Sequence, residues 1–89
     1  MGHHDQLALA EIELPAKGNN VPFWAGGEQY TIRADQDTAW HLYGPARFGR
    51  LPILGYWVTV PDGYAIFDER EGLSKKVTAD WRQLVRQLM

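Results

Sequence analysis

The sequence predicts an α+β fold: a twisted, mainly antiparallel sheet of four or five strands, either open or barrel-like, with one C-terminal helix packed on it. Two observations support this prediction. Alternating apolar segments are joined by short turns within residues 30–42 and again within residues 56–67, as in β-hairpins. From Trp81 onward the apolar residues change to a helical spacing. Strands followed by one helix indicate a sheet that the helix covers on one face.

Length and composition indicate a single domain over residues 1–89, with polar residues 1–6 expected to be disordered. A chain of 89 residues can bury one modest core. Hydrophobic residues make up 45% of it and charged residues 22%, which is the balance of a globular protein. Four Trp, four Tyr and three Phe supply the large buried side chains that so small a domain needs.

The first expected strand is Leu7–Leu14, in which apolar residues alternate with two glutamates. Its first half is also compatible with a short helix. Pro15 ends the pattern, and residues 15–27 are rich in Pro, Gly and Asn, which predicts a loop. Loops of this length are often functional, and this one carries Phe23 and Trp24.

The next two strands form a hairpin around Asp35-Gln36-Asp37. A three-residue loop pairs Ile32 with Trp40 and Tyr30 with Leu42, which gathers the apolar side chains on one face. A four-residue loop would mix the faces, so we prefer the first register. The opposite face is mostly polar and carries Gln29, Thr31, Arg33, Ala39, His41 and Tyr43.

Residues 44–53 are expected to form a loop that leads into the second hairpin, Tyr56–Val60 and Tyr64–Phe67. We interpret Pro61-Asp62-Gly63 as a three-residue turn that Gly63 closes with a positive φ. This hairpin ends in the charged run Asp68-Glu69-Arg70-Glu71 and Gly72, and the final element is the helix.

The register of the second hairpin predicts which residues share a face. One face would carry Val58, Val60, Tyr64 and Ile66, and the other Trp57, Thr59, Ala65 and Phe67. We expect the first set to seat the helix. Trp57 and Phe67 then lie against the loop with Phe23 and Trp24, form a second small core in a curled sheet, or stay exposed as an interface.

The helix is predicted from Trp81, with Leu84, Val85 and Leu88 on one stripe at i, i+3, i+4 and i+7. Thr78 is the expected N-cap.

Charge and composition argue against several partners. The net charge is -2 and the pI about 5.8, so no global basic field attracts nucleic acid or an anionic membrane. No cysteine is present, which excludes disulfides and thiolate zinc sites. No apolar run is long enough to span a bilayer and the start does not resemble a signal peptide. We therefore expect a cytoplasmic protein without a membrane partner.

Catalytic residues are sparse. His41 is the only histidine after residue 4, and Ser74 is the only serine. His41 could meet Thr31 across the strand or a carboxylate such as Asp68 or Glu69, but no nucleophile accompanies it. A free amine before His3 could bind copper(II) or nickel(II), although such tails arise easily by chance. We expect neither an enzyme nor a cofactor or metal site.

Two binding functions follow from the remaining signals. The leading expectation is a protein-interaction or assembly module whose aromatic sheet surface binds a protein partner or a second copy through Trp57, Phe67, Phe23 and Trp24. The alternative is a small nucleic-acid-binding domain that uses Arg47, Phe48 and Arg50, because arginine pairs with phosphate and an aromatic ring stacks on a base. We favour a plainer interpretation of that segment, in which Phe48 plugs into the core and both arginines face water.

Overall fold

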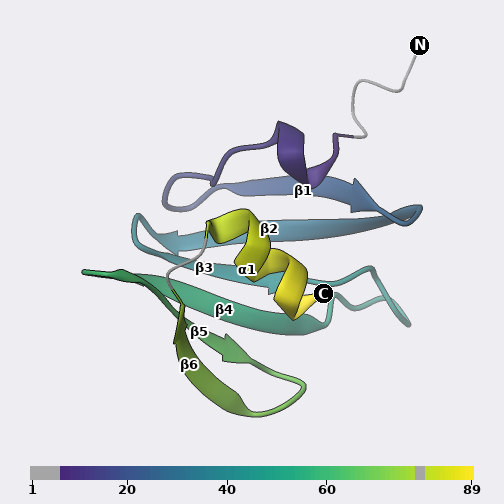
Figure 1. Ribbon diagram of the computed structural model, residues 1–89. Helices are drawn as coiled ribbons and strands as arrows, with labels where there is room; N and C mark the ends of the chain where they lie inside the picture. Colours follow the sequence, from purple (N-terminus) through teal and green to yellow (C-terminus); the bar gives the residue numbers. More distant parts are fainter. Residues whose placement is uncertain (1–6, 78–79) are drawn as a thin grey trace.

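The computed structural model describes residues 7–77 and 80–89, in which six antiparallel strands form one open sheet with the order β1-β2-β3-β4-β5-β6. One helix, α1, follows the strands and lies across one face of the sheet (Figure 1). The elements are η2 (Leu9–Glu11), β1 (Asn20–Ala25), β2 (Glu28–Gln36), β3 (Ala39–Tyr43), β4 (Ile53–Val60), β5 (Gly63–Asp68), β6 (Leu73–Val77) and α1 (Trp81–Leu88). The α+β class is confirmed, but the sheet has six strands rather than four or five and does not close into a barrel. The N-terminal His3 and the expected disorder of residues 1–6 lie outside the described residues.

The expected strand Leu7–Leu14 is wrong. Its middle forms a single 3-10 turn, η2, which only overlaps the first half for which a short helix was the alternative. Leu9 and Ile12 are buried three residues apart on the core side of this turn. The Arg82 guanidinium donates to the carbonyl oxygens of Leu9, at 3.3 Å, and Ile12, at 2.6 Å, and so ties this segment to α1.

Strand β1 lies inside the segment predicted to be a loop. Its backbone N–H groups alternate between β2 and the outer edge. The Trp24 N–H faces the edge, because it donates to the Leu7 carbonyl oxygen at 2.8 Å. The backbone nitrogen of Pro22, two residues earlier, also points to the outer edge, so the missing N–H of proline removes no hydrogen bond to β2. An edge strand therefore tolerates this proline.

The β2–β3 hairpin keeps its predicted apolar face in a different register. Ile32 pairs with Leu42, and Ala34 pairs with Trp40. The register is shifted by two residues from the predicted one, with a bulge at Asp35. Because side chains alternate with a period of two, an even shift leaves every residue on its predicted face.

The β4–β5 register is wrong by one residue, which exchanges the faces of β5. Trp57 pairs with Ile66, and Tyr56 pairs with Phe67. The turn has two central residues, Pro61 and Asp62, and Gly63 is already paired with Val60. Proline at i+1 and glycine at i+3 are preferences of a type I turn. Trp57 and Phe67 therefore lie on opposite faces, and Val58 and Val60 do not seat the helix.

Strand β6 was not predicted, because Leu73-Ser74-Lys75-Lys76-Val77 lacks an alternating apolar pattern. It pairs only with β5 and forms one edge of the sheet. Exposed lysines on such an edge discourage pairing with another chain.

Helix α1 packs against the sheet as predicted, through buried Trp81, Leu84, Val85 and Leu88. The expected N-cap Thr78 lies outside the described residues, and Asp80 directly precedes the helix. The sheet contributes to the same core with Phe23, Ile32, Ala34, Trp40, Leu42, Trp57 and Ile66. The face that α1 covers is called the helix face below, and the opposite one the outer face.

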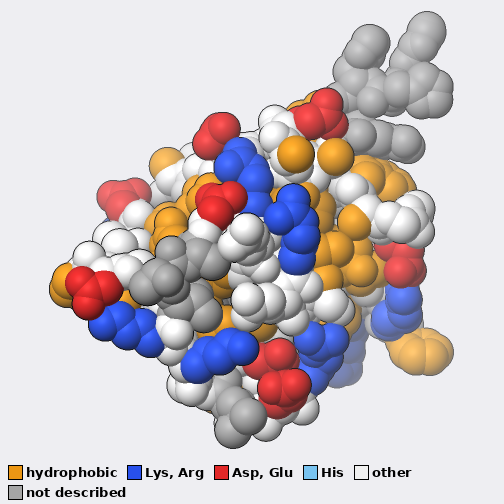
Figure 2. Space-filling view, in the orientation of Figure 1, with side chains coloured by type: hydrophobic (Ala, Val, Ile, Leu, Met, Phe, Trp, Pro, Cys, Tyr) orange, Lys and Arg blue, Asp and Glu red, His pale blue; other side chains and the backbone are white. Residues whose placement is uncertain are grey.

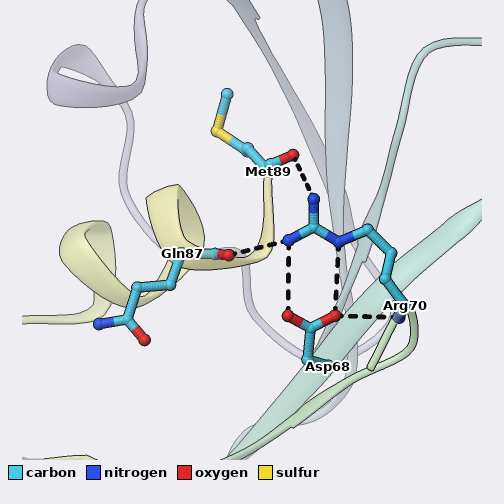
Figure 3. A network of polar contacts seen from close by, with 4 residues as sticks. All are labelled: Asp68, Arg70, Gln87 and Met89. Carbon is cyan, nitrogen blue, oxygen red and sulfur yellow. Dashed lines mark hydrogen bonds and ion pairs between the residues drawn. The ribbon is translucent and has the colours of Figure 1, made fainter. Parts of the chain in front are cut away.

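Arg70, in the turn between β5 and β6, holds the C-terminal end of α1 (Figure 3). Its guanidinium donates to the carbonyl oxygens of Gln87, at 3.1 Å, and Met89, at 3.0 Å, and also pairs with the Asp68 carboxylate. A cation at this position satisfies helix carbonyls and complements the negative end of the helix dipole. The contact therefore fastens the helix to the β5–β6 end of the sheet.

Candidate protein-interaction surface

The strand registers align one row of residues across the whole outer face. The row consists of Asn20, Arg33, His41, Tyr56, Phe67 and Ser74, one from each strand. In the described part of the chain, α1 covers only the opposite face (Figure 1). The centre of the row lies on β3 and β4, the two middle strands of the sheet.

Aromatic rings are in contact along the middle of this row. The rings of His41 and Tyr56 are 5.3 Å apart, and those of Tyr56 and Phe67 are 5.2 Å apart and stacked. Tyr43, two residues along β3, stacks on His41 with a centroid distance of 6.3 Å. We call these four residues the aromatic row. Tyr56 is 37% exposed and the other three are half-buried, so the rings support one another and still present faces to solvent.

His41 is paired with a carboxylate that the sequence did not suggest. The bulge in β2 turns Asp35 toward the Nδ1 atom of His41, and bulges commonly redirect a side chain in this way. Arg33 and Tyr56, rather than Thr31, are the direct cross-strand neighbours of His41. A histidine–aspartate pair alone does not constitute a hydrolytic site, because a nucleophile must lie within hydrogen-bond reach.

The single serine does not supply that nucleophile. Ser74 lies in the same row as His41 but three strands away, or about 14 Å at the usual strand spacing. Among residues 7–77 and 80–89, no group of three His, Cys, Asp or Glu side chains is arranged to hold a metal ion.

A groove lies beside the aromatic row on the outer face. It consists of a cleft of about 490 Å³ lined by Trp24, Gln29, Thr31, Pro45, Ala46 and Leu51, together with Gly27 and Glu28. A second cleft of about 310 Å³ shares Thr31 and Leu51 with it and reaches Tyr43. We call the two clefts together the β1–β2 groove. The shared residues make it continuous with the aromatic row.

The segment Arg47-Phe48-Gly49-Arg50 is a tight turn in the loop between β3 and β4. The N–H of each arginine donates to the carbonyl oxygen of the other, at 2.7 and 2.9 Å. Phe48 and Gly49 both have positive φ angles, 53° and 76°. The Phe48 side chain is fully exposed, at 102%. The expectation that Phe48 plugs into the core is therefore wrong.

The four aromatic residues predicted to bind a partner do not form one surface. Trp57 and Phe23 are both 0% exposed and belong to the core on the helix face. Phe67 and Trp24 are half-buried on the outer face, on β5 and β1, with three strands between them in the sheet. Trp57 and Phe23 therefore support the sheet from beneath, whereas Phe67 and Trp24 are available for contact.

Sequence reasoning missed Tyr56 as a site residue, although it placed His41 and Tyr43 on the outer face correctly. The missed signal was the position of Gly63. Reading this glycine as the last residue of a type I turn, instead of part of a longer loop, pairs Tyr56 with Phe67.

Charges of both signs are interspersed on the helix face (Figure 2). No described helix is long and apolar enough to cross a membrane. No protein-family profile matches this chain, and comparisons with curated proteins and with solved structures found no significant match either.

Proposed function

We propose that this chain is a non-catalytic protein-interaction or assembly module that binds through its outer face. The observation that supports this proposal is the aromatic row on the two central strands and β5, on the face that α1 leaves open. Tyr, Phe and Trp are enriched at the centre of protein interfaces, and charged residues are depleted there. We also propose a cytoplasmic location.

The architecture suits such a role because the aromatic row has a rigid support. The core residue Trp57 stacks on Trp40 directly beneath the central strands, with a centroid distance of 6.1 Å. Rings held in place by a packed sheet lose little conformational entropy when a partner binds, which favours affinity. Trp24, at the far end of the β1–β2 groove, extends the contact surface beyond the row.

Site-specific photo-crosslinking in cells tests this proposal. Tyr56 is replaced by the photoreactive amino acid p-benzoylphenylalanine, which preserves an aromatic side chain at the centre of the row. We expect covalent adducts with a protein, identified by mass spectrometry. The matched control carries the same amino acid at Gln83, which is exposed on α1, and should give none of these adducts.

A second variant makes the result specific. Adding Phe67→Ser to the position-56 crosslinker removes the neighbouring ring and should reduce the yield of the same adduct at least fivefold. Equal adducts at positions 56 and 83, or no adduct at position 56 under conditions in which the protein is abundant, would contradict the proposal.

The exposure of Phe48 supports a second candidate, binding of single-stranded nucleic acid. Two arginines flank an exposed ring that could stack on a base. Arg47, however, is paired with Glu28 at 2.9 Å, and the net charge is -2. If nucleic acid binds, changing Arg47 and Arg50 to Ala should flatten the slope of log K against log salt by about one to two units. No binding at low salt would exclude this candidate.

A further inference from the structure

Phe48 occupies a backbone conformation that is unfavourable for its side chain. Its φ of 53° lies in the left-handed region, which glycine and asparagine adopt readily but bulky residues rarely do. The next residue, Gly49, suits the same turn without strain. Backbone strain of this kind concentrates at binding sites, and here it holds a large apolar side chain entirely in solvent.

The turn that carries Phe48 is fixed in place by its neighbours. Both backbone hydrogen bonds of the turn are formed. The Gly44 N–H donates to the Pro52 carbonyl oxygen at 2.8 Å, which closes the base of the loop. The Arg47–Glu28 ion pair ties the turn to β2. The exposed ring is therefore presented by an ordered loop that projects from the strand ends (Figure 1).

The β1–β2 groove lies next to this turn, and the same loop contributes Pro45, Ala46 and Leu51 to its wall. Phe48 does not fill the groove of its own chain, because its side chain makes no contact that reduces its exposure. The wider cleft, about 490 Å³, lies in the size range of sites that accept an aromatic group.

The fit between the turn and the groove is one of shape. Glu28, which lines the wider cleft, is already paired with Arg47 of its own chain, and Arg33 lines the second cleft. A protruding group and a complementary cleft side by side on one surface allow two copies to exchange them about a twofold axis, which closes the assembly as a dimer.

We propose that Phe48 of one copy inserts into the β1–β2 groove of a second copy, and the reverse, to form a closed homodimer. This inference rests on the proposed function and deepens it, since it names the partner as a second copy of the chain. The groove joins the aromatic row at Tyr43, so the dimer contact is continuous with that row.

Sedimentation velocity over a concentration series, from about 1 μM to 1 mM in protein, tests the proposal. The unaltered chain should change from monomer to dimer. Phe48→Asn should weaken dimerisation at least thirtyfold. At about 1 μM, where both chains are monomeric and dimerisation adds no stability, its melting temperature should be unchanged or higher, because Asn accepts the left-handed conformation. A lower melting temperature of the variant at this concentration would instead show that Phe48 supports its own fold and would overturn the proposal.

Phe67→Ser separates this inference from the proposed function, because Phe67 belongs to the aromatic row but to neither the turn nor the groove. It should change dimerisation less than Phe48→Asn does. A dimer that Phe67→Ser abolishes and Phe48→Asn leaves intact would overturn this inference while supporting the proposed function. A chain that stays monomeric up to 1 mM would also overturn it, whereas crosslinking at position 56 would still test for another protein.

Thiol trapping locates the contact directly, since the chain has no cysteine. An Arg50→Cys chain mixed with a Gln29→Cys chain should give a mixed disulfide on mild oxidation, and an Arg50→Cys chain mixed with a Ser74→Cys chain should give several-fold less. Equal yields would contradict insertion into the groove. Binding of a single-stranded RNA oligonucleotide that Phe48→Asn abolishes, without any dimer, would assign the turn to nucleic acid instead.

Discussion

Gly55 determines how closely α1 approaches the sheet. A Cβ atom at this position would lie 2.6 Å from Cδ2 of Leu88 and 2.5 Å from the carbonyl oxygen of Phe67. Both distances are far below van der Waals contact, and the strand carbonyl cannot move without disturbing the β4–β5 pairing. Gly55 is therefore required by close packing and not by a turn.

We expect Gly55→Ala to destabilise the fold by about 1–3 kcal/mol, the usual cost of overpacking a core. Urea denaturation measures this change. Gly44→Ala is the matched control, because its Cβ would meet only the flexible Leu54 side chain, at 3.3 Å. Similar losses in the two variants would contradict the close-packing argument.

Neighbouring residues Tyr56 and Trp57 lie on opposite faces and should respond differently to truncation. Trp57 is 0% exposed and packs on Trp40, so Trp57→Ala should cost about 3–5 kcal/mol of stability. Tyr56→Ala should cost about 1 kcal/mol or less, the value of a cross-strand pair on an exposed face. Denaturant titration of both variants checks the assignment of faces, and the reverse order would refute it.

At the scale of the elements, the Asp68–Arg70 pair links α1 to the β5–β6 end of the sheet. Partial burial raises the pKa of Asp68, but the hydrogen bond from the Arg70 side chain, backbone N–H groups and the positive charge outweigh burial and hold this pKa below its usual value. The folded state therefore favours the charged carboxylate.

This shift gives stability a defined pH dependence. Because the pKa of Asp68 is lower in the folded than in the unfolded state, its contribution is present above about pH 4 and is lost as the pH falls through the folded pKa. Asp68→Asn should lower the melting temperature at pH 7 and reduce its fall between about pH 5 and pH 2. Asp62→Asn, at an exposed ion pair with Lys76, should change little. If the melting temperatures of the unaltered chain and of Asp68→Asn fell in parallel as the pH is lowered, this account would be contradicted.

At the scale of the whole molecule, α1 supplies a large share of the core. It buries Trp81, Leu84, Val85 and Leu88, and each such burial contributes about 1.5–3 kcal/mol. Together these contributions rival the roughly 5–15 kcal/mol by which a small domain is stable. Ending the chain after Val77 should therefore abolish cooperative thermal unfolding, as followed by circular dichroism. A sharp transition in the shortened chain would show that the sheet folds without α1.

The proposed binding function also belongs to the whole molecule, because it needs both faces of the sheet. The helix face is closed by α1 and stabilises the sheet, which leaves the outer face free to carry aromatic residues without a structural task. A sheet of this size with one helix can be covered on one side only. The aromatic row therefore lies on the face proposed for binding, whereas the residues that stabilise the fold lie on the helix face.

The local sequence determined the features that depend on spacing along the chain. The helical spacing from Trp81 predicted α1 and its buried face correctly. The alternation in the β2–β3 hairpin predicted its two faces, including His41 and Tyr43 on the outer one, because a register error of two residues preserves the faces. The exposure of Phe48 could not be predicted, since Arg47-Phe48-Gly49-Arg50 is compatible with an inward or an outward ring.

Tertiary structure decided the features that depend on partners distant in sequence. Strands β1 and β6 have weak local patterns and form because β2 and β5 offer them hydrogen-bonding edges. The β4–β5 register differs by one residue from the prediction, and an odd shift moves every side chain of β5 to the other face. The turn at Gly63 can be read with two or three loop residues, and the observed register is the one that places Trp57 and Ile66 together on the face that α1 covers.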